Sequence, residues 1–405
     1  MSAEPKTGWK QRRVDELFEI FSGVTMGPAR APSKRTRGYL RVANVQRGRI
    51  DLTDVMQIET FHGDGQRYAL AEGDLLIVEG HANPGEIGRC AVVDAASEGL
   101  LHQNHLFRLR SNRMLPQLAM ELLNSPMARR YWLARTATSS GLYTINRRML
   151  AALRLPDIPL REQQEIVEIL DAVAESEQTA ERAIAKLRTI RSSFIEERIA
   201  AIDRWAPLCE RLETIEAGNS PNLPGIPASP GEWGVLKVSA IGKETFRATE
   251  NKRVFDPGLI DEACEVAPGD LIISRASTSS LVGRTCVVTE SPYRLLLSDK
   301  TLRIVLKSGE ASRRYVNICF ESVRLREQIE AVSSGISAGM QNISQKAIER
   351  IQIPWVDIDL QRKFVAEVHS IDDRVSVEQS VLAKLREVRL GLTASLLTGS
   401  RKSLV

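Results

Sequence analysis

The sequence has few of the features that would tie it to an oxidising compartment or a membrane. Its five cysteines, at positions 90, 209, 264, 286 and 319, form no Cys-x-x-Cys pair and are odd in number, so we interpret them as free thiols. No apolar run approaches the roughly 18 residues that a membrane span needs. The first 13 residues lack the apolar core of a signal peptide, so we expect a cytoplasmic protein with no membrane contact.

Signatures of catalysis are also missing. "NPGE" at 83–86 lacks the second proline and the aromatic residue of the loop that adenine methyltransferases use, and "GKET" at 242–245 does not fit a phosphate-binding loop. The triplet "ENK" at 250–252 lacks the upstream acidic partner of the common nuclease motif. His102 and His105 have no cysteine or carboxylate close in sequence to complete a metal site. We therefore expect a non-catalytic chain without a cofactor or metal of its own.

Acidic residues are absent from two stretches in the first part of the chain, 20–50 and 122–156. Basic stretches without acids are the electrostatic footprint of phosphate contacts. Residues 156–204 show the opposite balance, with 11 acidic against 7 basic residues, so we expect different partners for the two regions. The first stretch supplies the candidate DNA contacts Arg30, Lys34, Arg35, Arg37 and Arg41.

The chain repeats itself at an interval of 195 to 198 residues. "IAKLRTIR" at 184–191 returns as "LAKLREVR" at 382–389, and "EGDLLIVEG" at 72–80 returns as "PGDLIISRA" at 268–276. Further pairs, such as "IGRCAVV" with "VGRTCVV" and "INRRMLAALRLP" with "ISQKAIERIQIP", keep the same order. The sequence therefore predicts an internal duplication of one unit.

Each copy combines a globular part with a long helix. Short β-like runs such as "DLLIV" and "LIIS", broken by Gly, Asn, Pro and Asp, predict a mixed α/β domain. Apolar residues then recur in steps of three and four, at seven of nine positions from 166 to 194 and again from 364 to 392. This spacing is typical of a coiled coil, and a helix with such a stripe needs a partner.

We predict an α+β fold built as a tandem duplication. Two mixed α/β domains, at 1–157 and 205–355, are joined by long helices at 158–204 and 356–400 that form an antiparallel coiled coil with pseudo-twofold symmetry. The alternative is that each helix packs on its own domain. Two like domains with reversed orientation suit duplex DNA, whose strands are antiparallel and whose major groove returns to the same face every ~34 Å.

A small, polar loop in each copy is the sharpest candidate for DNA contact. "TATSSGLYTINRR" at 136–148 contains small residues that let the backbone approach a phosphate, followed by a helix start that favours an anion. The counterpart at 333–346 is just as polar but less basic, so we expect the two domains to read different sequences. The candidates are Ser139, Gly141, Tyr143, Asn146, Arg147 and Arg148 in the first copy, and Arg275, Ser277, Gln341, Asn342, Ser344 and Lys346 in the second.

Several segments taken together have a family likeness. They are the tryptophan that opens each repeat (Trp9 and Trp205), "GDLLI" with "GDLII", "LYTINRRMLAALRLPDIPLREQQEIVEIL", and "KLREVRLGLTASLLTG" near the C-terminus. With them the chain resembles, over essentially all of its 405 residues, the specificity (S) subunit of type I restriction-modification systems. The resemblance implies that each globular part is a target recognition domain for one half of a bipartite DNA site. It also implies that the helices set the spacing and dock two methyltransferase (M) subunits.

The resemblance further implies that the chemistry resides on partner subunits. The M subunits bind S-adenosylmethionine and methylate adenine, and restriction (R) subunits, which use ATP and Mg, join through them. Two alternatives remain open. The first alternative is a recognition subunit of a related defence system that only methylates DNA. The second is a scaffold that binds protein instead of DNA.

Overall fold

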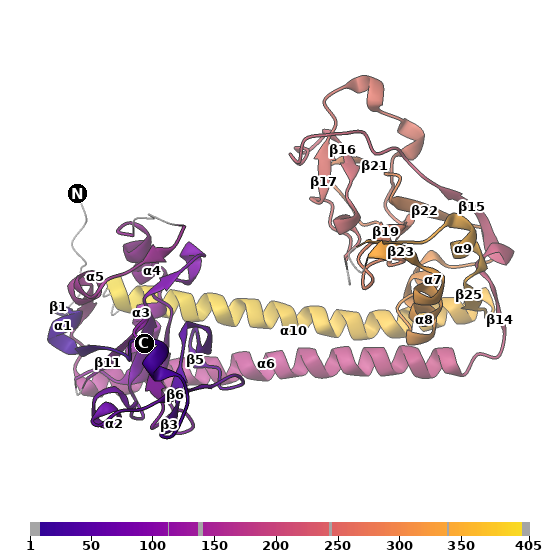
Figure 1. Cartoon of the computed structure of the whole chain (residues 1–405). Helices are drawn as coiled ribbons and strands as arrows, with labels where there is room; N and C mark the ends of the chain where they lie inside the picture. Colours follow the sequence, from indigo (N-terminus) through magenta and orange to yellow (C-terminus); the bar gives the residue numbers. More distant parts are fainter. Residues whose placement is uncertain (1–8, 112, 137–140, 243–244, 338–339, 399–405) are drawn as a thin grey trace. The chain divides into compact units, whose positions relative to one another are not determined.

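The computed structural model describes residues 9–111, 113–136, 141–242, 245–337 and 340–398, which divide into two compact units. Unit 1 comprises the described residues up to Glu181 together with those from Ser380, and unit 2 is Arg182–Gln379. Each unit contains small sheets, short helices and a stretch of both long helices (Figure 1). The division between the units therefore falls within the two long helices.

A four-stranded antiparallel sheet forms the centre of each unit. The inner strands β7 and β18 are buried at every residue, in keeping with the apolar sequence LLIV of the first and LII of the second, which ends in the buried Ser274. The strand order is the same in both units, and the second strand of each sheet along the chain, β7 or β18, lies at an inner position. In unit 1 the order is β2 (Glu19–Ser22), β11 (Leu106–Arg110), β7 (Leu75–Val78), β9 (Cys90–Val92), and in unit 2 it is β15 (Leu212–Glu216), β22 (Thr301–Leu306), β18 (Leu271–Ser274), β20 (Thr285–Val287).

Smaller sheets extend the correspondence. Each unit has a three-stranded sheet whose middle strand has one parallel and one antiparallel neighbour, and a two-stranded antiparallel ladder that joins its first and last strands. The three-stranded sheets are β10 (Leu101–His102), β3 (Thr36–Leu40), β6 (Met56–Glu59) and β21 (Arg294–Leu296), β16 (Trp233–Leu236), β17 (Asn251–Arg253). The ladders are β1 (Gln11–Arg13) with β13 (Arg154–Pro156) and β14 (Trp205–Pro207) with β25 (Gln352–Pro354). Unit 1 adds a hairpin of β4 (Val45–Gln46) and β5 (Arg49–Ile50).

Several of the short helices begin at side-chain caps. The hydroxyl groups of Ser125 and Ser322 accept hydrogen bonds from backbone N–H groups in the first turns of α4 and α8, which satisfies donors that a helix start leaves open. The short helices of unit 1 are α1 (Val14–Leu17), α2 (Asp64–Tyr68), α3 (Pro116–Asn124), α4 (Pro126–Leu133) and α5 (Arg147–Ala152), and those of unit 2 are α7 (Arg313–Cys319), α8 (Val323–Val332) and α9 (Gln345–Arg350). Single 3₁₀ turns lie at Pro28–Arg30, Val42–Asn44, Pro84–Glu86, Leu208–Arg211, Val238–Ala240, Pro257–Leu259 and Glu262–Cys264.

One pair of glycines explains part of the repeat. Gly23 and Gly218 occupy corresponding positions next to the three-stranded sheets, where the chain passes very close to another segment. A Cβ atom at Gly23 would lie 2.1 Å from the carbonyl oxygen of His102, and one at Gly218 would lie 2.0 Å from that of Leu297. Because neither neighbour is a flexible side chain, only glycine fits at either position.

The two long helices are present and pack on each other. They are α6 (Leu160–Ala200) and α10 (Ile358–Thr398), slightly shorter than the predicted 158–204 and 356–400. Each is anchored near its start by a buried glutamine. Gln163 and Gln361 accept a hydrogen bond from the backbone N–H of Leu115 and Ser312, respectively, and each donates to a carbonyl group just before its own helix.

The helices also enter the cores of both units. In unit 1, Ile166 and Leu170 from the start of α6 belong to the core, and Leu392 from the end of α10 packs against it. In unit 2, Phe364 from the start of α10 and Ile195 from the end of α6 belong to the core. The coiled-coil prediction and its alternative are therefore both partly right, because each helix packs on its partner and on the globular parts.

Ion pairs show that the helices run antiparallel within each unit. Residue numbers fall along α10 as they rise along α6, so the pairing order is that of opposed chains. In unit 1 the pairs are Arg389 with Glu177 (3.1 Å) and Arg386 with Glu181 (2.7 Å), and in unit 2 they are Arg191 with Asp372 (2.6 Å) and Arg198 with Glu367 (3.1 Å).

Two of these arginines also bind the globular part of their unit. Arg389 bonds to Glu121 of α3, and that hydrogen bond raises the pKa of Arg389. Arg191 bonds to Glu321, with 2.5 Å between Nη1 and Oε2. Arg191 and Arg389 are the last residues of the repeated phrases "IAKLRTIR" and "LAKLREVR". Each copy of the phrase thus ends in an arginine that joins the helix pair to a globular part.

Replacing Arg191 by methionine should destabilise unit 2. The change keeps most of the side-chain volume but leaves the carboxylates of Glu321 and Asp372 without their shared cation, which costs about 1–2 kcal/mol for partly exposed groups. Urea unfolding followed by circular dichroism measures this as a lower midpoint. Lys186→Met, on an exposed site of α6, is the matched control, and equal midpoints for the two variants would contradict the role given to Arg191.

Candidate nucleic-acid interface

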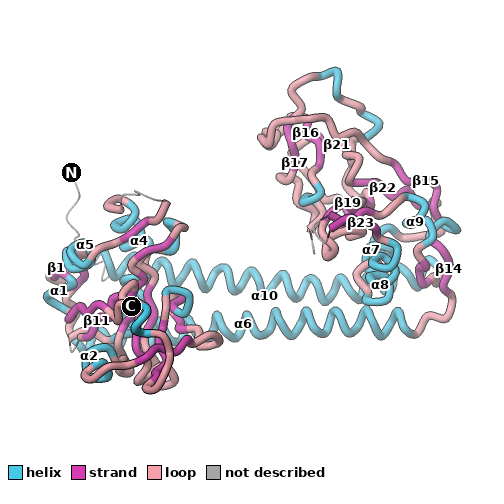
Figure 2. Tube along the Cα trace, in the orientation of Figure 1, coloured by secondary structure: helices cyan, strands magenta, loops and turns pink. Residues whose placement is uncertain are grey.

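The polar loops predicted to contact DNA are held by short strands beside the central strand of each sheet. In unit 1, β8 (Gly80–His81) follows β7 and pairs antiparallel with β12 (Tyr143–Thr144). In unit 2, β19 (Ala276–Ser277) follows β18 and pairs with β24 (Met340–Asn342), whose other neighbour is β23 (Ser334–Ser337; Figure 2). The structure thus brings part of each predicted loop to the end of a central strand, in the same way in both units.

The predicted residues of the first loop divide between structural and exposed positions. Tyr143 is half-buried in β12, and Asn146 caps α5, since its Oδ1 accepts from the backbone N–H of Met149 at 2.9 Å. Gly141, Arg147 and Arg148 are exposed, so the two arginines are open to a ligand. The predicted Ser139 lies outside the described residues.

The second loop repeats this division with other residues. Ser344 caps α9 and accepts from the backbone N–H of Ala347 at 3.1 Å, while Lys346 is exposed on the same helix. Ser277 lies opposite Gln341 in the ladder of β19 and β24, and Asn342 is exposed there. Arg275, between β18 and β19, is exposed as well. The structure therefore places three predicted residues, Ser277, Gln341 and Asn342, in one ladder, and Arg275 directly before it.

The first basic stretch is less uniform than its sequence indicates. Arg30 is bound to Asp64 and lies over the ring of Phe61, with 4.3 Å from its Cζ to the ring centroid. Arg41 is paired with Asp54 at 2.6 Å. The guanidinium groups of Arg30 and Arg41 are thus already neutralised by carboxylates. The other three predicted contacts of this stretch are exposed: Lys34, Arg35 and Arg37.

Sequence reasoning missed Glu79, which lies between β7 and β8. Its Oε2 is 3.0 Å from Nδ1 of His105, a residue that the sequence analysis considered only as a metal ligand. The repeat held the signal for this position, because Glu79 aligns with Arg275 when "EGDLLIVEG" is placed on "PGDLIISRA". In unit 2 the residue that corresponds to His105 is Lys300, which is exposed and which sequence reasoning did not select.

The chain is similar in sequence to several curated proteins. It is 29% identical to the type I restriction enzyme EcoEI specificity subunit of Escherichia coli over 194 residues, which cover 47% of this chain but only 32% of that protein. It is 22% identical to the putative type I restriction enzyme MjaX specificity subunit of Methanocaldococcus jannaschii over 411 residues, 96% of this chain and 93% of that protein. The EcoKI specificity subunit of Escherichia coli is 26% identical over 44% of this chain and 40% of its own length. The resemblance to type I specificity subunits is confirmed.

Solved structures of type I systems have the same fold as this S-subunit-like chain. A chain from the type I R-M system studied for complex assembly and conformational transition has a TM-score of 0.61, at 17% identity over 98% of this chain and 99% of its own. The S subunit from M. genitalium has a TM-score of 0.54, at 14% identity over 98% of both chains. No family model matches the sequence.

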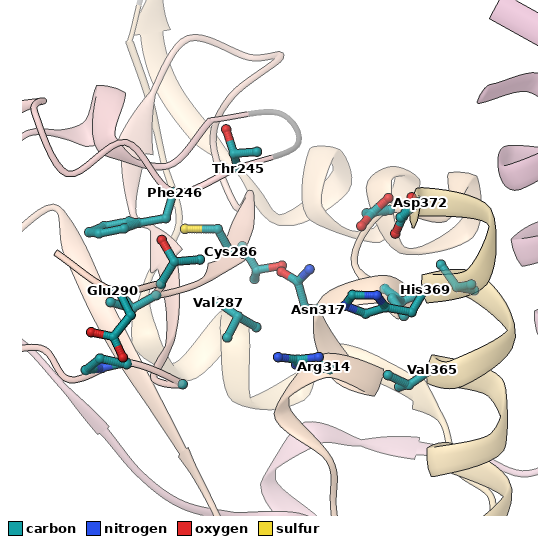
Figure 3. A pocket seen from close by; sticks show the side chains of 18 of the residues that line it. Thr245, Phe246, Cys286, Val287, Glu290, Arg314, Asn317, Val365, His369 and Asp372 are labelled. Carbon is teal, nitrogen blue, oxygen red and sulfur yellow. The ribbon is translucent and has the colours of Figure 1, made fainter. Parts of the chain in front are cut away.

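A hollow in unit 2 is lined by residues outside the predicted loops. It has a volume of about 670 Å³ and lies between β20, α7 and the first half of α10, with His369 and Asp372 on the helix facing Cys286 and Asn317 across the space (Figure 3). Its lining carries charges of both signs, and the guanidinium of Arg191 is already bound to two carboxylates. The hollow therefore has little net positive charge for a phosphate, and we place the candidate interface at the loops.

Membrane and metal sites can be judged for the described part of the chain. None of its helices combines the length and apolar character that crossing a membrane requires. Nor do the described residues contain a group of three or more His, Cys, Asp or Glu side chains suited to a metal ion. Of the histidines considered for such a site, His102 is fully buried, with Nδ1 3.0 Å from the carbonyl oxygen of Tyr68, whereas His105 is exposed.

His102 should make unit 1 sensitive to acid. Burial lowers the pKa of His102 to about 4, whereas the unfolded chain has the ordinary value near 6.5. Between these pH values the unfolded state binds a proton that the folded state excludes, so stability falls as the pH drops, by up to about 1.4 kcal/mol per pH unit. Below pH 4 both states are protonated and this loss stops.

Thermal unfolding of the full chain between pH 7 and pH 4 measures this loss. His102→Gln should flatten the decline in melting temperature, because the amide does not titrate. His62→Gln changes an exposed histidine and should leave the decline as it is. A decline that is the same in all three proteins would contradict the assignment to His102.

Proposed function

We propose that the chain is the DNA specificity subunit of a type I restriction-modification complex. Each globular part acts as a target recognition domain for one half of a bipartite DNA site. The long helices set the spacing between the half-sites and dock two M subunits, and R subunits join through these. The chain itself is not catalytic; S-adenosylmethionine, ATP and Mg belong to the partner subunits, and the complex acts in the cytoplasm.

One observation carries this proposal: two units share one backbone scaffold and present different polar side chains from it. The ladders of β8 with β12 and of β19 with β24 each begin shortly after the inner strand of the four-stranded sheet, β7 in unit 1 and β18 in unit 2. The first presents Tyr143 and is followed by Arg147 and Arg148, whereas the second presents Gln341 and Asn342. A protein that reads two unlike half-sites needs this combination, because sequence is read by side chains that reach base edges.

The charge distribution supports the same function. Lys34, Arg35, Arg37, Arg147 and Arg148 are all exposed in unit 1. Exposed cations of this kind release counterions from DNA when they contact phosphates, which supplies affinity without regard to sequence. Phosphate contacts would hold the domain in register while the ladder residues meet the bases.

The proposed role of the helices rests on the way each unit is built. Because the core of a unit contains the start of one long helix and the end of the other, the globular part cannot shift along the helices without disrupting its core. A continuous α-helix of 41 residues has a length of roughly 60 Å. Such elements are suited to fix a distance, and their exposed faces are available to partner subunits.

Removing the exposed cations of the first basic stretch should weaken DNA binding by the same factor for all sequences. In a Lys34→Gln, Arg35→Gln, Arg37→Gln variant, the slope of log K against log salt should become shallower by about 0.9 for each phosphate that no longer meets a cation. Gel shifts at several salt concentrations measure it. The control replaces three exposed lysines of the long helices, Lys186, Lys363 and Lys384, by glutamine. Equal slopes for both variants would argue against the phosphate contacts.

Sequencing of methylated adenine in cells that carry the system tests the function itself. We expect a split motif with an unspecified gap, and exchange of residues 1–157 for those of another S subunit should change only one half of it. A change in both halves would contradict the two-reader proposal. Methylation without DNA cleavage would indicate the methylation-only alternative, and binding to protein without salt-dependent DNA binding would indicate a scaffold.

A further inference from the structure

One residue in each unit joins three segments of the candidate interface through its backbone. The N–H group of Glu79 donates to the carbonyl oxygen of His105 (3.0 Å), and its own carbonyl accepts from the N–H of Ile145 (2.8 Å). In unit 2, the N–H of Arg275 donates to the carbonyl of Lys300 (2.8 Å), and its carbonyl accepts from Ile343 (2.9 Å). Positions 79 and 275 are therefore equivalent at the level of individual hydrogen bonds.

The residues that hold both positions are buried. The residue before each, Val78 or Ser274, is buried in the central strand, with 0% and 1% of its surface exposed. Ile145 and Ile343, which bond to the two positions from the loops, are fully buried. At each position the preceding residue and the hydrogen-bond partner from the loop are both buried and hold the backbone. The side chain therefore leaves the backbone at the same place in both units.

The side chains at these equivalent positions have opposite charge. Glu79 is an acid whose Oε2 contacts His105, and within the described residues the structure gives its Oε1 no partner. Arg275 is a base beside the exposed Lys300, and no carboxylate among the described residues pairs with either. Asp299, which follows Ser298 in the same turn, accepts a hydrogen bond from the hydroxyl group of Ser220.

We propose that positions 79 and 275 are matched specificity positions, one in each half-site. Glu79 accepts a hydrogen bond from the N4 amino group of a cytosine, and Arg275 donates two hydrogen bonds to O6 and N7 of a guanine. Lys300 contacts the flanking phosphate. This inference deepens the proposed function and rests on it.

The chemistry of base edges favours these assignments. In the major groove a carboxylate matches an amino donor, and cytosine presents one, whereas the planar guanidinium matches the two acceptors of guanine. Arginine is preferred over lysine for a two-point contact because its donors form a fixed fork. The exchange of acid for base at one scaffold position would thus change the base that is read without altering the fold.

The test measures binding of the full chain, together with its M subunits, to a panel of duplexes. The panel contains the split motif found by methylation sequencing and every single base-pair change in it. Arg275→Gln should reduce discrimination at one guanine in one half-site by about tenfold to a hundredfold. Glu79→Gln should act only on a position in the other half, and Arg275→Lys should retain more of the discrimination than Arg275→Gln does.

Two controls remove the same charges elsewhere. Glu98→Gln and Arg350→Gln change exposed residues outside the ladders and should leave discrimination at every position unchanged. Melting temperatures identify any variant that does not fold, in which case Arg275→Lys, with its charge retained, decides the question for unit 2.

The different failures can be told apart. If Arg275→Gln weakens binding to all duplexes equally and lowers the salt dependence, Arg275 contacts phosphate and its assignment to guanine is overturned. If both variants discriminate like the unchanged chain, the inference is overturned while the proposed function stands. If the unchanged chain gives no split motif and no salt-dependent binding, the proposed function fails and the inference fails with it.

Discussion

The pairing of arginines with carboxylates along the helix seam is the constraint on which the structure depends. Glu177 and Arg191 interrupt the apolar stripe of α6, and Glu378 and Arg389 interrupt that of α10; Arg191 pairs with Asp372, and Arg389 pairs with Glu177, across the two helices. A charge in a partly buried seam costs more when unpaired than it contributes when paired. A slip of one turn would leave these groups without partners, so they select one register among several that apolar contacts alone would allow.

Folding of the helices and folding of the globular parts are coupled through the same residues. A long helix gains most of its stability from tertiary packing, and here the packing partners lie at both of its ends. Gln163 and Gln361 bind the backbone before α3 and α7, and the bonds from Arg389 and Arg191 to Glu121 and Glu321 add a second attachment. Within a unit, the sheets, the short helices and the long helices therefore form one structure.

The sequence was informative where its pattern was long and dense. Nine successive stripe positions and a repeat of whole phrases predicted both long helices to within a few residues of their bounds. The ladders of β8 with β12 and β19 with β24 were not predicted, because strands of two or three residues are too short to show a period. Nor did the sequence separate Arg30 from Arg35, since the acid that binds Arg30 lies 34 residues away.

Comparison of the two units separates positions where the side chain holds the fold from positions where the backbone does. Gln163 with Gln361, and Arg191 with Arg389, are alike because the side chain itself makes the structural contact. Glu79 and Arg275 differ while the same backbone hydrogen bonds are made at both positions, so a change of side chain leaves those bonds intact.

The same distinction applies to the helix caps. Asn146 and Ser344 differ in sequence, yet each supplies an oxygen that accepts from the first turn of its helix, so the structural function is retained and only its chemistry varies. Arg147 and Gln345, the residues that follow these caps, differ in charge, and each is the first residue of its helix. A position that varies while its backbone contacts persist can change its side chain without altering the fold, and the two units contain such positions in corresponding places.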